Sequence, residues 1–190
     1  FYNNSACHIN SHILFHGTGM TPSEFGANYL FPYLGIDNPY WLNGYLQIND
    51  GSASLHLNLR DMVKLGQLYL QGGSSGSEQV ISSNWIDRAT SAQTSTGWGY
   101  YGYLWWLNDD FGTSYSAQGL GGQIIAVFPE YDLVIGAQSD IFGPSDINTH
   151  SNLLNNRIIN VAEIFEGYVN EESLPTISSF SLIAQDTLVL

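Results

Sequence analysis

The order of the predicted elements in this sequence indicates an α+β fold with an antiparallel sheet. Helical patterns dominate the first half of the chain, closely spaced strand patterns fill residues 98–142, and one more helical pattern follows. Such short connections leave no room for helical crossovers, so the strands are expected to form an antiparallel meander.

The composition fits a folded domain and excludes several classes of partner. The 190 residues suit one domain, and a hydrophobic content of 44% provides material for a core. The four Lys and Arg against 17 Asp and Glu give a net charge of −13, which disfavours nucleic acid and anionic lipid as partners. The single cysteine excludes an internal disulfide framework or a cysteine-cluster zinc site. No apolar run reaches the roughly 18 residues of a membrane span.

Two helices are predicted near the start of the chain. Residues 5–18 carry a helical apolar stripe, with Ser5 as the expected N-cap. Thr21 and Glu24 have the spacing of a capping box and open a second helix, expected to end near Pro32. The stripe on the first helix comprises Ala6, Ile9, Ile13 and Leu14.

A long irregular stretch, residues 33–57, precedes the next two helices. A loop of this length carries function or marks an insertion. Asn58 is the expected cap of a helix over residues 59–71, and Ser82 or Ser83 caps a shorter one. The expected buried side of the helix after Asn58 comprises Met62, Leu65, Leu68 and Leu70.

The strand region is expected to contain four strands, of which the last two form a hairpin. The four ranges are 101–107, 113–118, 122–128 and 133–137. The turns between them include Asp109-Asp110 and Glu130-Tyr131. The final helix is expected over residues 146–168, with Leu153, Leu154, Ile158, Val161, Ile164 and Phe165 on its apolar face.

The domain is expected to span residues 1–170. Residues 171–190 read as a linker or as the start of a further β element.

Three glycines, Gly119, Gly121 and Gly122, lie at the start of the expected strand of residues 122–128. Glycine at such a place permits close approach of a ligand or of another backbone. One interpretation is a sheet edge that lines a substrate cleft, and the other is a tight strand crossing without chemistry.

Two further clusters suggest ligand sites but have simpler explanations. His8, His12 and His16 share one side of the first helix, yet three histidines spread over two turns cannot reach one ion without distortion. No metal site is therefore expected there. The second cluster consists of six aromatic residues between positions 98 and 106. They could stack on a sugar, but alternating aromatic residues in a strand more often belong to the hydrophobic core. They are Trp98, Tyr100, Tyr101, Tyr103, Trp105 and Trp106.

Five segments carry recognisable motifs, and their order along the chain is informative. They are Tyr2-Asn3-Asn4, residues 24–35, residues 59–66, residues 101–106 and residues 118–123. Taken together, they resemble the C-terminal part of the serine β-lactamase and penicillin-binding-protein superfamily. The nearest resemblance is to the class C-related branch, with its esterases, D-aminopeptidases and 6-aminohexanoate-dimer hydrolases. It covers roughly residues 1–168 and implies an antiparallel sheet flanked by helices with a helical subdomain, the N-terminal part of that fold lying outside this chain.

The resemblance implies a reaction and a set of site residues. In the family, a serine of Ser-x-x-Lys attacks a carbonyl and forms an acyl-enzyme. By resemblance Tyr2 is the base or proton shuttle, Asn4 orients the substrate, and the Leu120 N–H binds the oxyanion. The implied substrate-binding residues are Ala117, Gln118, Gly119, Gly122 and Gln123. No metal or organic cofactor is implied.

Two departures from the family pattern shape the prediction. The only lysine, Lys64, has Asp61 three residues before it, so Ser-x-x-Lys is expected in an upstream segment. Ala117 stands where the family has a Lys or His that binds a substrate carboxylate, which favours a neutral ester or amide substrate over penicillins.

The sequence therefore predicts part of a periplasmic or secreted serine hydrolase that acts on a small-molecule ester or amide. The alternatives are a catalytically inactive relative that binds a substrate or glycan, and a structural module whose acidic surface confers solubility.

Overall fold

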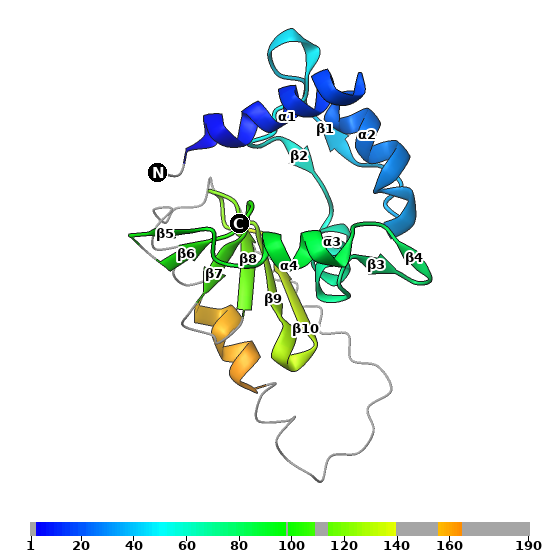
Figure 1. Ribbon diagram of the computed structural model, residues 1–190. Coiled ribbons are helices and arrows are strands. Elements are labelled where there is room, and N and C mark those ends of the chain that lie inside the picture. The colour runs from blue at the N-terminus through cyan, green and yellow to red at the C-terminus, as the bar shows by residue number, and fades with distance from the viewer. Residues whose placement is uncertain (1–2, 98, 109–113, 140–155, 165–190) are drawn as a thin grey trace, which may run out of the picture.

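The computed structural model describes residues 3–97, 99–108, 114–139 and 156–164. Its six-stranded antiparallel sheet lies among helices, with a separate helical region at one end (Figure 1). This arrangement confirms the predicted α+β class and the antiparallel meander.

The described helices are α1 (Asn4–Thr18), α2 (Pro22–Tyr29), α3 (Leu59–Leu70), α4 (Ser83–Ala89) and residues 156–164, with short 3-10 turns η1 (Pro32–Leu34), η2 (Tyr45–Gln47) and η4 (Pro129–Tyr131). The main sheet has the order β10-β9-β8-β7-β6-β5. Its strands are β5 (Thr94–Thr96), β6 (Gly99–Tyr101), β7 (Trp106–Asn108), β8 (Ser114–Gln118), β9 (Ile124–Phe128) and β10 (Leu133–Ala137). Two further two-stranded antiparallel sheets pair β1 (Tyr40–Trp41) with β2 (Leu55–His56) and β3 (Ser74–Ser75) with β4 (Glu78–Gln79).

Strand β9 is buried on both faces because helices cover the two sides of the sheet. Ile125 and Val127 join a core cluster with Met62 of α3. The alternate residues point to the opposite face, as the period of two in a strand requires. There the cluster comprises Ile124, Ala126, Phe128, Ile158 and Ala162, the last two from residues 156–164.

Two glycines allow α3 to lie close against the sheet. A Cβ atom on Gly66 would lie 2.6 Å from Val134 Cγ1 and 2.7 Å from Ile125 Cγ2. On the strand side, a Cβ on Gly136 would lie 2.6 Å from Val63 Cγ2. Each contact is shorter than packed carbon atoms tolerate, so the helix and the strands can approach this closely only because these side chains are missing.

The caps after residue 20 confirm the predictions. Thr21 and Glu24 form a complete capping box at the start of α2, which ends at Tyr29. The Asn58 side chain accepts the Asp61 N–H at 2.9 Å and begins α3. Ser82, of the two serines considered, caps α4.

The predicted cap and apolar stripe of α1 are wrong. Asn3, not Ser5, is the N-cap, because its Oδ1 accepts the Ala6 N–H at 2.8 Å. Ile9 and Ile13 of the expected stripe are 56% and 63% exposed.

The physical reason is that α1 packs through a polar side. Ser11 is its only buried residue, and a Cβ on Gly51 would lie 2.3 Å from Ser11 Oγ. At 100° per residue, Ile9 and Ile13 project from the opposite side of the helix.

The strand predicted over residues 101–107 is two strands, β6 and β7. A turn separates them: the Gly102 N–H donates to the Trp105 carbonyl at 2.9 Å, and Leu104 has a left-handed φ of 67°. The turn packs against α4, since a Cβ on Gly102 would lie 2.0 Å from the Ala89 carbonyl oxygen. Strand β5 was not predicted, and β9 begins at Ile124 instead of residue 122.

The β9–β10 hairpin agrees with its prediction, with Leu133 paired to Phe128. The last helix is described only over residues 156–164, where Ile158 is buried but Val161 and Ile164 are 38% and 60% exposed. The Asp109-Asp110 turn, the rest of that helix with Leu153, Leu154 and Phe165, and the expected linker 171–190 lie outside the described residues.

Candidate active site

The glycine-rich segment forms a closed turn between β8 and β9. The Gly119 N–H donates to the Gln123 carbonyl at 2.8 Å, and the Gly122 N–H donates to the Gly119 carbonyl at 3.1 Å. Gly122 has a φ of 78°, in the left-handed region that glycine adopts without steric cost. The glycines therefore build a tight turn at the end of the sheet.

Side chains from two places hold this turn. The Gln123 Oε1 accepts the Gly121 N–H at 3.1 Å, and the Ser139 hydroxyl donates to the Gly121 carbonyl at 2.5 Å. A Cβ on Gly119 would lie 2.7 Å from Gln123 Oε1, so the Gln123 side chain is folded against the turn.

Leu120 is the exposed residue of the turn, at 80%. Its N–H belongs to the same peptide unit as the Gly119 carbonyl, which points across the turn to Gly122. In a trans peptide the N–H and C=O point in opposite directions, so the Leu120 N–H points outward. Among the described residues it has no hydrogen-bond acceptor. An outward backbone N–H is the kind of group that stabilises a developing oxyanion.

Residues Ala117 and Gln118 extend beyond the last pair between β7 and β8. Strand β7 pairs with β8 only as far as Ser116, whereas β9 pairs with β8 through Gln118. Strand β8, which was expected at a sheet edge, is therefore an interior strand over residues 114–116. In the described sheet, Ala117 and Gln118 pair with β9 alone. The Gln118 side chain donates from Nε2 to Ser116 Oγ at 2.9 Å.

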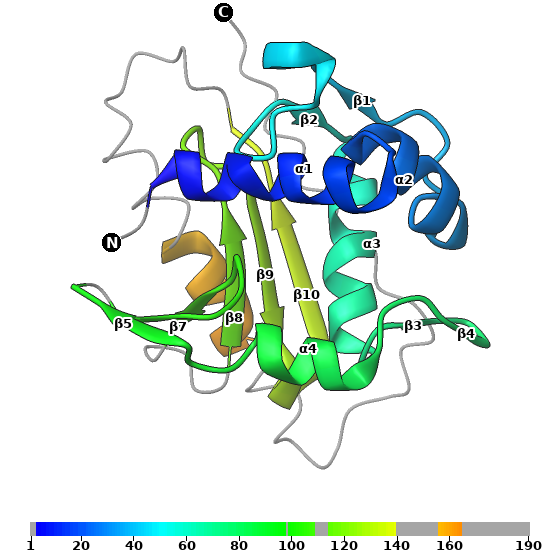
Figure 2. The ribbon, with the colours of Figure 1, turned by 45° about the horizontal axis from the view of Figure 1, so that its top comes forward.

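The N-terminal part of α1 lies at the end of the sheet where β8 ends and β9 begins, in both ribbon views (Figure 2). Asn4, the first residue of α1, is exposed. Tyr2 lies outside the described residues. The fold therefore brings the start of α1 and the β8–β9 turn to the same end of the sheet, although more than 100 positions separate them in the sequence.

The one lysine of the chain has a structural place. Lys64 Nζ lies 2.7 Å from Asp61 Oδ1 and 2.5 Å from the Gly35 carbonyl oxygen. The Asn58 Nδ2 donates to the other Asp61 oxygen at 2.6 Å. These bonds join α3 to the segment after η1, so Lys64 has a different role from the lysine of a Ser-x-x-Lys motif.

His8 attaches α1 to the loop before β2, whereas the rings of His12 and His16 contact those of His8 and Phe15 in the same helix. His8 Nδ1 lies 3.2 Å from Asp50 Oδ1 and accepts the Gly51 N–H at 3.3 Å. Hydrogen bonds from Ser52, followed by the nearby His8, hold the pKa of the Asp50 carboxyl below its usual value. Within the described ranges, no three His, Cys, Asp or Glu side chains come together as metal ligands.

The aromatic cluster is mostly structural. Trp105 is 6% exposed and contacts Tyr115, with ring centroids 5.2 Å apart. Tyr103 stacks on Trp85 at 5.3 Å, while Tyr100 is 44% exposed. The core interpretation is confirmed for Trp105, and Trp98 lies outside the described residues.

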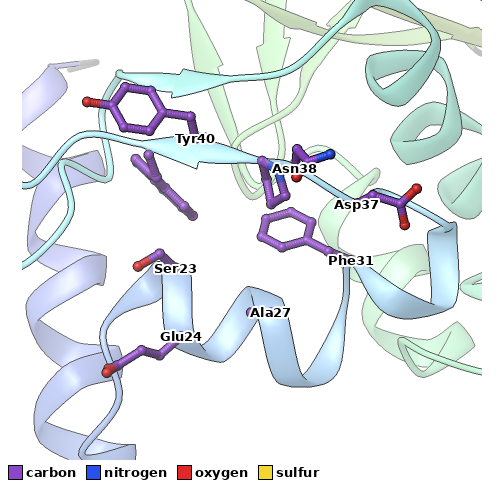
Figure 3. Close-up of a pocket in the computed structure, with 9 residues that line it drawn as sticks. Ser23, Glu24, Ala27, Phe31, Asp37, Asn38 and Tyr40 are labelled. Atoms are coloured by element: carbon purple, nitrogen blue, oxygen red, sulfur yellow. The ribbon is translucent and has the colours of Figure 1, made fainter.

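Sequence reasoning missed an open groove of about 620 Å³ between α2 and the β1 region (Figure 3). Its two carboxylates do not converge on a ligand. Glu24 belongs to the capping box, and hydrogen bonds from Thr21 lower its pKa. Asp37 points away from the Phe31 ring in Figure 3. The sequence feature that could have indicated this groove is Trp41, a large aromatic residue within the long irregular stretch of residues 33–57. The lining residues are Ser23, Glu24, Ala27, Phe31, Asp37, Asn38, Pro39, Tyr40 and Trp41.

The chain belongs to the Beta-lactamase family, whose model matches residues 2–155. This agrees with the resemblance drawn from the five segments. A search of curated proteins finds no significant match.

Two solved structures share the fold. A putative 6-aminohexanoate-dimer hydrolase from Bacillus anthracis is 24% identical with a TM-score of 0.75, and the alignment covers 88% of this chain and 44% of that one. A β-lactamase from Mycobacterium bovis is 14% identical with a TM-score of 0.61, over 84% of this chain and 64% of that one. The 190 residues thus span about half the length of the first of these. In the part of the chain that the structure describes, no helix is long and apolar enough to cross a membrane.

Proposed function

We propose that this chain is part of a serine hydrolase that cleaves an ester or amide through an acyl-serine intermediate. The observation that carries the proposal is the outward Leu120 N–H on a braced turn at the end of the sheet. Membership of the Beta-lactamase family and the fold shared with two hydrolases support it.

The nucleophile of the proposed reaction is the serine of a Ser-x-x-Lys segment outside these 190 residues. Its Oγ attacks the substrate carbonyl carbon while its proton passes to the Tyr2 and lysine pair. The oxyanion that forms accepts a hydrogen bond from the Leu120 N–H. The carbonyl–leaving-group bond then breaks, the leaving group takes the proton, and water later cleaves the acyl-serine by the same route.

The proposed substrate is a neutral ester or amide. A substrate carboxylate is best bound by a cationic side chain. Ala117 supplies none, and Lys64 is held by Asp61 and the Gly35 carbonyl. The net charge of −13 further disfavours an anionic substrate at long range.

The competing proposal is an inactive relative that binds a substrate or glycan. The groove lined by Phe31, Tyr40 and Trp41 is the observation that favours it. A fluorophosphonate probe separates the two proposals, because it forms a covalent bond only with an activated serine. Labelling of one serine in the full-length protein supports the hydrolase, and absence of labelling overturns it.

The role of Tyr2 has its own test. In the full-length protein, Tyr2→Phe removes the hydroxyl that moves the proton, so kcat should fall by on the order of 10²-fold. Steady-state hydrolysis of a chromogenic ester measures this effect. Unchanged turnover would contradict the role of Tyr2, while labelling by the probe would still support the hydrolase.

A further inference from the structure

The β8–β9 turn is held from outside as well as by its own backbone. Three consecutive peptide units, from Gly119 to Gly122, each have a fixed hydrogen bond. The first accepts the Gly122 N–H at its carbonyl, the second donates its Gly121 N–H to Gln123 Oε1, and the third accepts the Ser139 hydroxyl at the Gly121 carbonyl.

These bonds act on the direction of the Leu120 N–H. The Ser139 hydroxyl binds the Gly121 carbonyl, which belongs to the same peptide unit as the Gly122 N–H. That N–H in turn donates to the Gly119 carbonyl. The Gly119 carbonyl and the Leu120 N–H lie in one rigid plane, so fixing one fixes the other. Gln123 holds the peptide unit on the other side of Leu120. The Leu120 N–H is therefore oriented from both flanks.

Ser139 is itself anchored, since the chain after β10 is tied to the base of α3. The neighbouring Gln138 donates from Nε2 to the Leu57 carbonyl at 3.0 Å, just before the helix begins. The Gln138 side chain binds the start of α3 and the Ser139 side chain binds the β8–β9 turn, so this segment connects the packed core to the site.

We infer that Gln123 and Ser139 are positioning residues that aim the Leu120 N–H at the oxyanion of the proposed reaction. This inference rests on the proposed function. It assigns Gln123 to holding the turn, in place of the direct contact with substrate that the resemblance implied. A preorganised donor is effective because it needs no reorientation when charge develops. A turn without these braces samples other directions and loses that advantage.

The test uses the full-length protein and five variants. Gln123→Met keeps the volume without the amide oxygen, and Ser139→Ala removes the hydroxyl. Each should lower kcat about 10-fold, with KM changed less than about twofold, because the donor acts mainly in the transition state. Ser139→Thr keeps a hydroxyl and should restore kcat. Gln93→Met and Ser75→Ala delete similar bonds far from the turn, to the Arg88 and Tyr33 carbonyls, and should leave kcat unchanged.

Amide hydrogen exchange, measured by NMR, reports how firmly the hydrogen bonds of the turn are held, independently of catalysis. Gln123→Met should speed exchange of the Gly121 amide about 10-fold or more, and the control variants should not. Unchanged exchange overturns the inference whatever the activity. Faster exchange with unchanged kcat also overturns it, while the hydrolase function stands. A wild-type protein that neither hydrolyses esters nor reacts with fluorophosphonate overturns the proposed function, and the inference falls with it.

Discussion

Strand β9 and helix α1 contain similar apolar residues but bury them very differently. All five residues of β9 are buried, whereas α1 has one buried residue in 15, and that residue is Ser11. Strand β9 has α3 on one face and residues 156–164 on the other. In the described structure α1 is packed on the Ser11 side and leaves Ile9 and Ile13 exposed.

The difference shows that apolar content does not tell which side of an element is covered. Both faces of β9 are covered, so a residue of this strand is buried whichever face its side chain points to. In α1 the covered side is set by the loop before β2, where His8 makes polar contacts with Asp50 and the Gly51 N–H and where Ser11 packs closely against Gly51. Stability should therefore depend strongly on β9 and weakly on the isoleucines of α1.

The largest effect is expected from Phe128→Ala in β9. Phe128 is 2% exposed and packs in the cluster with Ile158 and Ala162. Loss of the ring leaves a cavity, so the free energy of unfolding should fall by about 3–5 kcal/mol. Urea denaturation measures the change. Phe128→Leu should lose less, and a loss below about 1 kcal/mol in the alanine variant would contradict the burial described for this face.

A pH-dependent effect is expected from Tyr115, which faces α3 in the sheet core. Burial, with a smaller contribution from Tyr69, raises its pKa from 10.0 to about 12. The unfolded phenol ionises at the lower pH, so the stabilising contribution is complete below about pH 10 and is lost as pH rises to about 12. The loss should be roughly 2–3 kcal/mol across this window. Stability curves of the wild type and of Tyr115→Phe should differ in slope only there, and parallel curves would refute the assignment.

The smallest effect is expected on α1. Ile9→Ser and Ile13→Ser alter exposed side chains, so each should change the free energy of unfolding of the 190-residue chain by less than about 0.5 kcal/mol. The same substitutions in the full-length protein test whether another segment covers this face. A loss above about 1 kcal/mol in the 190-residue chain would show that the comparison with β9 is wrong.

Local chemistry explains the features that could be predicted. The capping box of Thr21 and Glu24, the Asn58 cap and the β9–β10 hairpin depend on neighbouring residues, so the sequence contains them in full. The division between β6 and β7 could not be predicted in this way. It depends on contact of Gly102 with the Ala89 carbonyl of α4, a residue 13 positions away.

The same distinction holds at the candidate site. The glycines of residues 119–122 indicated a tight turn, and the resemblance selected Leu120 as a donor. The resemblance also implied that the start of the chain and this turn share one site, and the structure places the start of α1 at the same end of the sheet as the turn (Figure 2). The sequence did not indicate that Ser139 binds this turn.

The sequence alone determined the caps of α2 and α3, the hairpin, the acidic charge and the family pattern, because each depends on residue identity or short spacing. Only the tertiary structure decided which face of α1 is covered, where β6 ends, and how the Leu120 N–H is aimed. Those features depend on contacts between segments brought together by the packing of α3 and the sheet, and on exclusion of Cβ atoms at Gly66, Gly102 and Gly119.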